Sequence, residues 1–136
     1  MPSKGDILYS AVGATLGIPA IVNTNEPFCF QRHVAILKLN PQRADSQFVW
    51  HMLRSRTVFT TAWKSTTGSA QPTVPLRAIR QLPIPAPPLC EQHRIAADLD
   101  TLQTQVDALQ NLCSQTTAEL DALLPSVLDN AFKGNL

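Results

Sequence analysis

The sequence predicts an α+β protein: a small domain of mixed sheet and helices, followed by one long helix. Three observations predict this class. Short apolar runs bounded by turn residues fill residues 5–40, and a run with helical spacing fills residues 44–65. An apolar series with a seven-residue period then runs from Ile95 to Val127. We expect a globular domain over residues 1–89 and a helical region over residues 90–136.

The strands are expected in the first forty residues. The segments 6–10 (DILYS) and 18–23 (IPAIVN) have the length and composition of short strands, and Gly13 and Gly17 supply the turn between them. A third apolar run, residues 33–40 (HVAILKLN), ends at an Asn-Pro turn signal. The pattern predicts three strands of a buried or half-buried sheet.

Helical spacing begins after this sheet. Asp45 is a suitable N-cap, and large apolar residues then recur three or four positions apart. Two tryptophans in this run, Trp50 and Trp63, have two possible roles: stacking on nucleic-acid bases or packing in the core. The helical spacing favours the core for both.

The end of the globular part contains a loop and a proline-rich stretch. Residues 65–73 are polar, with Gly68 and Pro72 as turn residues. Residues 74–88 (VPLRAIRQLPIPAPP) are expected to be extended, because proline fixes its own φ angle and biases the residue before it towards extended geometry.

The helical region carries a regular apolar series, here called the seam. Its members alternate steps of four and three residues, which is typical of a coiled coil rather than of a globular helix. Residues flanking the seam offer no pairs of opposite charge, so it must associate by apolar packing. Pro125 is expected to break or kink the helix near Leu124. The seam consists of Ile95, Leu99, Leu102, Val106, Leu109, Cys113, Thr116, Leu120, Leu123 and Val127.

Composition and charge narrow the class of protein. The chain has 136 residues, of which 44% are hydrophobic and 15% charged, as in a globular protein. Residues 1–89 hold nine Lys or Arg against three acids, a balance of +6, whereas residues 90–136 hold two against seven, a balance of −5. The basic part is the one expected to meet a polyanion.

The sequence also predicts a location and excludes several chemistries. No apolar run is long enough for a membrane span, and the first residues lack the layout of a secretory signal. Three widely spaced cysteines fit neither a disulfide framework nor a zinc site, so a cytoplasmic protein is expected. The histidines His33, His51 and His93 have no metal-ligand spacing, and no phosphate loop or nucleophile motif is present. We expect no catalytic activity, metal or cofactor.

One combination of motifs resembles a known family. A Gly-Ser-Ala-Gln loop at Gly68–Gln71 leads to the proline strap and then to a Glu-Gln pair at the start of the long helix. This order resembles the specificity subunits of type I restriction-modification systems. The opening segment KGDILYSAVGATLG (residues 4–17) and the tail LLPSVLDNAFKGNL (residues 123–136) are also similar to that family. The strap matches at Leu82, Pro83, Ile84, Pro85, Pro87, Pro88, Leu89, Glu91, Gln92 and Ile95.

The resemblance implies a function and a set of partners. Such subunits read double-stranded DNA, pair their long helices as an antiparallel coiled coil, and dock methyltransferase and restriction subunits. A complete subunit has two recognition domains, whereas this chain has one, without the family's usual N-terminal portion. It is therefore expected to be a natural half-subunit, a truncated gene product or a cloned fragment. The expected homodimer forms through Ile95, Leu99, Leu102, Val106, Leu109, Cys113, Leu120 and Leu123.

The DNA-binding residues are expected on the basic part of the chain. Arginine and lysine would contact phosphates, while Ser69 and Gln71 either address base edges or only satisfy nearby backbone groups. The alternative function is a degenerate recognition domain that acts only in dimerisation or methyltransferase binding. The expected DNA-binding set is Arg32, Arg54, Arg56, Lys64, Thr66, Thr67, Gly68, Ser69 and Gln71.

Overall fold

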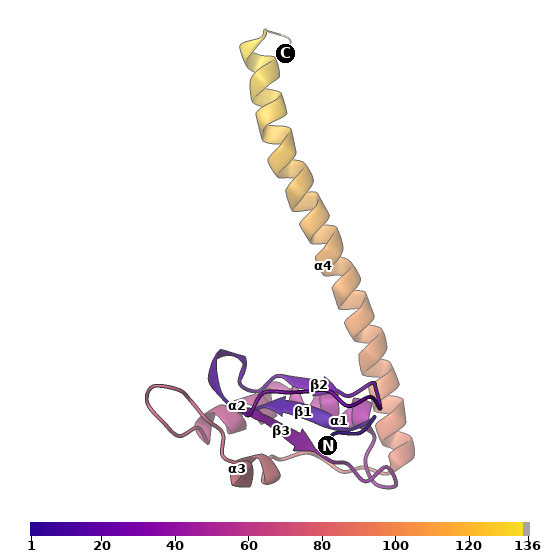
Figure 1. Cartoon of the computed structure of the whole chain (residues 1–136). Coiled ribbons are helices and arrows are strands. Elements are labelled where there is room, and N and C mark those ends of the chain that lie inside the picture. Colours follow the sequence, from indigo (N-terminus) through magenta and orange to yellow (C-terminus); the bar gives the residue numbers. More distant parts are fainter. Residues whose placement is uncertain (135–136) are drawn as a thin grey trace. The chain divides into compact units, whose positions relative to one another are not determined.

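The computed structural model describes residues 1–134 and has the mixed α+β fold that the sequence predicts. The chain divides into two compact units: unit 1 is Met1–Ala97, and unit 2 begins at Asp98. The elements are β1 (Ile7–Ser10), the 3-10 turn η1 (Gly13–Thr15), β2 (Pro19–Ile21), β3 (Val34–Leu37), α1 (Ser46–Leu53), α2 (Arg56–Lys64), α3 (Leu76–Arg80) and α4 (Leu89–Phe132) (Figure 1).

The three predicted strands form one antiparallel sheet in the order β2-β1-β3. Leu8 at the middle of β1 pairs with Ala20 on one side and with Ile36 on the other. Its neighbours Ile7 and Tyr9 are completely buried, as the two-residue alternation of a strand requires. The predicted turn at Gly17 is also present: Gly17 has a φ of +87°, and a Cβ there would lie 2.8 Å from the ring of Phe59.

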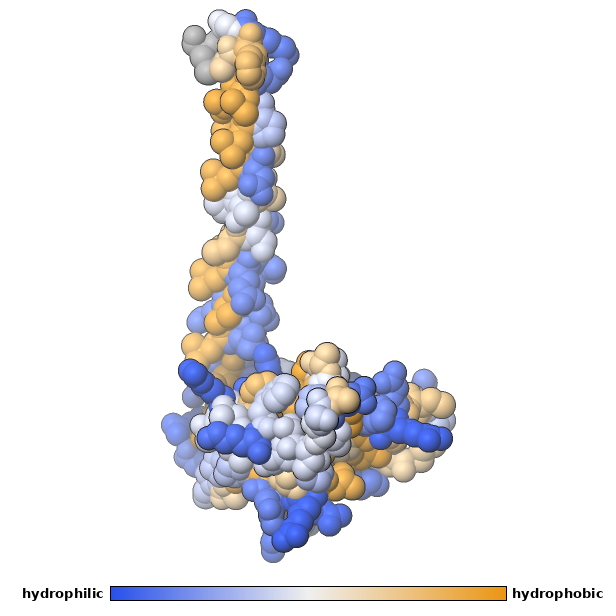
Figure 2. Space-filling model, turned by 90° about the vertical axis from the view of Figure 1, so that its left-hand side faces the viewer, coloured by the Kyte–Doolittle hydropathy of each residue, from blue (hydrophilic) through white to orange (hydrophobic). Residues whose placement is uncertain are grey.

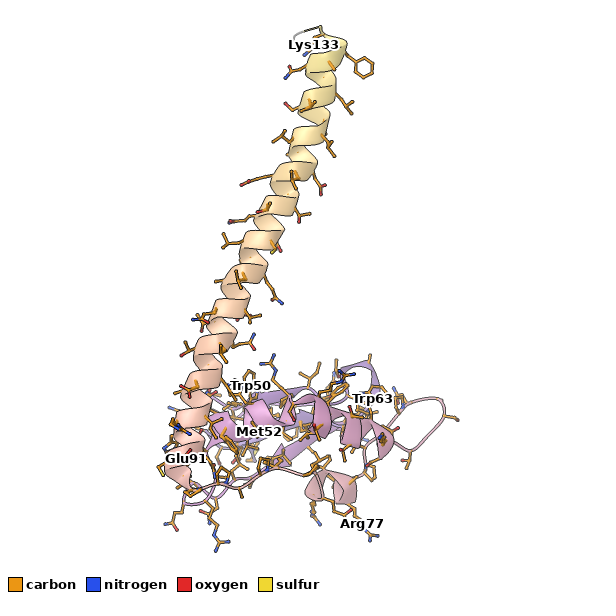
Figure 3. The ribbon with its side chains drawn as sticks, turned by 180° about the vertical axis from the view of Figure 1, so that it is seen from behind. Trp50, Met52, Trp63, Arg77, Glu91 and Lys133 are labelled. Atoms are coloured by element: carbon orange, nitrogen blue, oxygen red, sulfur yellow. The ribbon has the colours of Figure 1, made fainter. Side chains whose placement is uncertain are left out.

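Helices α1 and α2 lie on one face of this sheet (Figures 1 and 3). Asp45 caps α1 as predicted, since its carboxylate accepts a hydrogen bond from the Phe48 backbone N–H at 3.0 Å. The predicted helical run is divided in two, because Ser55 caps a second helix by accepting from the Val58 N–H. The core between sheet and helices is made mainly of Ile7, Tyr9, Leu16, Phe48, Val49, Leu53, Val58, Ala62 and Val74.

The two tryptophans have different environments. Trp50 on α1 is half-buried against the core, as predicted, and its indole N–H donates to the Pro19 carbonyl at 3.1 Å. The core prediction is wrong for Trp63, which is 40% exposed and lies beside Phe59 at a ring-centroid distance of 6.1 Å. The break at Ser55 explains the difference: α2 buries its face at Val58, and the adjacent face carries both aromatic rings.

The proline-rich stretch is only partly extended. Leu76–Arg80 forms the short helix α3, so the prediction of an extended segment throughout residues 74–88 is wrong there. Pro75 precedes the helix with a φ of −66°, a value compatible with a helix start, and Ile79 anchors the turn in the core. The four prolines after Leu82 follow in non-helical backbone up to the start of α4.

Helix α4 begins at Leu89, close to the predicted position, and continues through Pro125 to Phe132. The prediction of a break or kink is therefore wrong for the break, while the kink stays a prediction. Pro125 removes one backbone hydrogen bond, and at this exposed end of the helix water can hydrate the freed carbonyl. Asn135 and Leu136, the last residues of the predicted tail, lie outside the described residues. Within residues 1–134, every helix is too short or too polar to cross a membrane.

Candidate nucleic-acid interface

The predicted DNA-binding loop is attached to the end of the sheet by backbone pairing. Beyond β1, the Ala11 N–H donates to the His33 carbonyl at 3.0 Å, and the Val74 N–H donates to the Ala11 carbonyl at 2.8 Å. Thr73 forms bridges with both Val12 and Thr67. These contacts place the segment before β3, the end of β1 and the base of the loop side by side.

An open groove of about 360 Å³ lies at this meeting point. Residues 32–35, Ala11, Val12 and residues 73–76 line it. Arg32 is exposed at its edge and lies beside the base of the loop. The structure therefore brings one predicted basic residue, Arg32, into the same groove as the end of the predicted recognition loop.

The loop itself divides its side chains between two tasks. The hydroxyl of Thr66 donates to the Trp63 carbonyl at 2.8 Å, and that of Thr67 donates to the Thr73 carbonyl at 3.5 Å. Ser69 and Gln71 are exposed, and their side chains make no hydrogen bond within the part of the chain that the structure describes. The threonines thus support the turn, whereas the serine and the glutamine keep their polar groups available to a ligand.

Gly68 makes the tight turn of this loop possible. Its φ of +95° lies in a region that other residues rarely adopt. A Cβ at this position would also lie 2.9 Å from the Gln71 carbonyl oxygen. Gly68 is therefore explained by loop geometry alone, without any contact to DNA.

The other predicted basic residues occupy the two ends of α2. Lys64 is the last residue of α2 and lies immediately before the loop, while Arg56 is its first residue. Eight residues of helix separate them by about 12 Å. Arg54 precedes Arg56 at the α1–α2 junction, where its guanidinium lies 4.4 Å from the centre of the Trp50 ring. Arg54 and Arg56 lie outside the backbone pairing and the groove that bring Arg32 to the loop.

Two residues that sequence reasoning left out of the site belong to this region. His33 lines the groove next to Arg32, and Arg77 is exposed one residue after Leu76, which also lines it. Figure 3 labels Arg77 on α3. The length and apolar pattern of β3 predict the strand. No pattern in the sequence predicts that His33 pairs with Ala11, or where α3 starts.

The seam forms a second candidate surface, on α4. Figure 2 shows apolar side chains gathered along one side of this helix. Cys113 is an exposed free thiol on the seam, and the Thr116 hydroxyl donates to the Leu112 carbonyl at 2.9 Å. The seam residues that are large, apolar and exposed are Leu102, Val106, Leu109, Leu120, Leu123 and Val127, with exposed fractions from 42% to 62%. Such a long uncovered apolar surface is typical of an interaction site.

The described residues contain no group of three or more histidine, cysteine or acidic side chains that could hold a metal ion.

The fold and its two surfaces define an α+β recognition module: a basic domain with a polar loop beside a groove, and a long amphipathic helix. A family model described as the type I restriction modification DNA specificity domain matches residues 1–117. The chain belongs to this family.

Two curated relatives from Escherichia coli support the assignment. The chain is 28% identical over 133 residues to the type I restriction enzyme EcoBI specificity subunit, covering 98% of this chain and 28% of that protein. It is 26% identical over 94 residues to the EcoDI specificity subunit, covering 69% of this chain and 21% of that protein. The chain thus spans less than a third of the length of either relative.

Proposed function

We propose that this chain is a DNA sequence-recognition component of a type I restriction-modification system. Family membership supports the DNA specificity role, and the names of both relatives agree with it. In this proposal residues 1–89 read DNA and residues 90–136 act as a spacer and dimerisation helix. The chain supplies recognition and leaves the chemistry to methyltransferase and restriction subunits, which it joins in the cytoplasm.

One observation carries the DNA-binding part of the proposal. Ser69 and Gln71 have free polar side chains on a loop whose base shares a groove with Arg32. Arginine and lysine side chains position a protein on phosphates, while serine and glutamine can hydrogen-bond to base edges. We therefore assign phosphate contacts to Arg32 and Lys64, and base contacts to Ser69 and Gln71. Arg54 and Arg56 would contact phosphates farther along the duplex.

The helix part of the proposal concerns two copies of the chain. The exposed seam is covered when two α4 helices pair through it in a two-fold homodimer. Residues 90–124 alone correspond to about 50 Å of helix, more than the 34–36 Å of one DNA turn. Such a pair would hold two DNA-reading domains at a fixed separation and so restore the two recognition domains of a complete subunit.

A binding experiment tests the DNA-reading role. Fluorescence anisotropy would follow a labelled duplex pool of randomised sequence at 50 mM salt, with and without the methyltransferase subunit. We expect salt-dependent binding that the variant Ser69→Ala/Gln71→Ala retains on the random pool, because loss of base contacts leaves phosphate binding intact. Sequence selection from the pool should recover a defined site for the native chain and none for the variant.

The exposed seam also favours a second candidate function, that of a pure interaction protein. In this case the chain would bind the methyltransferase subunit and neither the random pool nor any selected duplex. Co-sedimentation with the methyltransferase subunit in the absence of DNA, combined with no change in anisotropy, would establish this second function and refute DNA reading.

A further inference from the structure

Trp63 has a surface position that the packing of unit 1 does not explain. Its side chain is 40% exposed, and its indole N–H has no hydrogen-bond partner within residues 1–134. The indole N–H of Trp50, by contrast, donates to the Pro19 carbonyl (Figure 3). A tryptophan that keeps both an apolar ring and a free N–H at the surface is typical of a binding site, because these two features together suit a ligand with apolar and polar parts.

Phe59 lies beside Trp63 and completes an apolar surface, here called the aromatic pair. Phe59 is 39% exposed, and the two ring centroids are 6.1 Å apart with the ring planes 57° apart. The ring of Phe59 lies over Gly17, since a Cβ on Gly17 would come within 2.8 Å of it. The ring therefore occupies a place where only a glycine leaves room, and the aromatic pair is held at the surface by the fold.

The aromatic pair lies between two cations on α2. Residues three and four apart are neighbours on a helix surface, so Arg56 lies one turn before Phe59, and Lys64 directly follows Trp63. All four side chains are exposed, and neither cation forms an ion pair within the described part of the chain. The exposed face of α2 thus combines apolar rings with unpaired positive charge, which favours a nucleic acid as its ligand.

We propose that this face of α2 lies in the major groove of DNA and that the aromatic pair reads a thymine. The inference rests on the proposed DNA-reading role and adds two specificity-determining residues to it. In the major groove, thymine presents an O4 acceptor beside an apolar 5-methyl group. The indole N–H of Trp63 donates to O4, and the rings of Trp63 and Phe59 cover the methyl group.

The exposure of the two rings favours contact in the groove over insertion between base pairs. A ring that separates two base pairs has to stand out from the protein surface, as the ring of Phe132 does with 89% exposed. More than half of Phe59 and of Trp63 is covered by the chain itself. A ring covered to this extent presents an edge and part of a face, which is enough to cover a methyl group.

The spacing of the two cations fits the same groove. About 12 Å of helix separates Arg56 from Lys64, and the major groove is about 12 Å wide and admits an α-helix. The two side chains can therefore reach phosphates on both sides of the groove while the aromatic pair between them faces the bases. The predicted recognition loop continues from this surface, because the N–H and the hydroxyl of Thr66 both donate to the Trp63 carbonyl.

Replacing thymine by deoxyuridine tests the contact, because uracil keeps O4 and the base pair and lacks only the methyl group. The duplex is the site that the native full-length chain selects from the random pool, with all thymines replaced together. Fluorescence anisotropy would give the dissociation constants. For the native chain, we expect the replacement to weaken binding about fourfold for the contacted methyl group. For Trp63→Ala, this preference for thymine should fall to less than about twofold.

Two further variants separate the contact from a structural role of the ring. Trp63→Phe keeps a ring and loses the N–H, so it should bind both duplexes about fivefold less tightly and retain the preference for thymine. Phe30→Ala is the matched control, because Phe30 is 40% exposed and lies beside another aromatic ring, that of Phe28, outside α2. It should keep both the affinity and the preference of the native chain. Urea unfolding followed by Trp50 fluorescence checks that Trp63→Ala is folded.

The outcomes separate this inference from the DNA-reading role. A native chain that binds both duplexes alike, a selected site without thymine, or a full preference retained by Trp63→Ala would each overturn the inference and leave DNA reading intact. Should Trp63→Ala not fold, native-like binding of Trp63→Phe to both duplexes would overturn it. A native chain that binds neither the random pool nor any selected duplex would refute DNA reading, and the inference with it.

Discussion

Helix α4 contains two stretches of one heptad stripe, and these stretches have different surroundings. In residues 89–97 the stripe is covered by the chain itself, and Gln92 and Ala96 are almost completely buried. From Leu102 onwards the same stripe is exposed over many turns. The apolar periodicity starts at Ile95 and predicts that the stripe is covered, but it does not specify what covers the stripe. Changes in the two stretches should therefore have separable effects, on folding in one and on association in the other.

The largest effect is expected in the exposed stretch. Leu109→Ala should weaken dimerisation by about 3 kcal/mol, roughly 100-fold in the dissociation constant, because each copy loses the burial of one leucine side chain. Sedimentation over a range of concentrations would measure this constant. Gln115→Ala, at an exposed position of α4 away from the seam, is the matched control and should leave it unchanged. An equal effect of both variants would refute association through the seam.

A change in the covered stretch should act on folding instead. The buried Gln92 side chain accepts from the Asp45 N–H at 2.8 Å and donates to the Arg43 and Pro87 carbonyls at 2.9 Å and 2.8 Å. Gln92→Ala would leave these backbone groups without partners, at a cost of about 3 kcal/mol in the free energy of unfolding. Urea unfolding followed by tryptophan fluorescence would measure this loss.

The same exposed control applies to Gln92. Gln115→Ala removes a glutamine from the same helix without removing a hydrogen bond to unit 1, so its unfolding midpoint should match that of the native chain. A Gln92→Ala variant as stable as this control would show that other contacts hold the start of α4 in unit 1, namely the packing of Ile95 and Ala96 and the contact of His93 with Asp45.

The covered stretch also illustrates how far the sequence can predict the fold and the candidate site. Strands, the Asp45 cap and the start of α4 follow from local patterns, and all three predictions are confirmed. Local patterns did not predict the partners of Gln92, which lie 47 and 49 residues away in the chain. The position of Arg32 beside the loop depends in the same way on pairing between distant segments, which a single sequence does not reveal. The Pro125 break was predicted from a local rule, and an exposed helix tolerates the exception.

A smaller effect, on the affinity for DNA, is expected from a change on the basic surface of unit 1. Lys64→Ala should weaken binding to all duplexes alike, by up to about tenfold at 50 mM salt, because one phosphate contact is lost. The slope of log K against log salt should fall by about 1. Lys38→Ala, at an exposed lysine just beyond β3, serves as the control with an unchanged slope. If Lys64→Ala leaves the slope unchanged, Lys64 makes no phosphate contact and the candidate interface moves towards Arg32.

The smallest effect concerns the core of unit 1. The Tyr9 hydroxyl is buried and has no hydrogen-bond partner within the described residues, and burial raises the pKa of Tyr9 above its usual 10.0. Tyr9→Phe should therefore stabilise the chain by about 1 kcal/mol at pH 7.

Above about pH 10 the native chain should lose further stability, because the unfolded state then ionises this tyrosine while the folded state resists ionisation. Tyr9 is the only tyrosine in the sequence, so the variant lacks this contribution entirely. Urea unfolding at pH 7 and pH 10.5 measures both effects, and a variant less stable than the native chain at pH 7 would mean that the hydroxyl has a partner in solution.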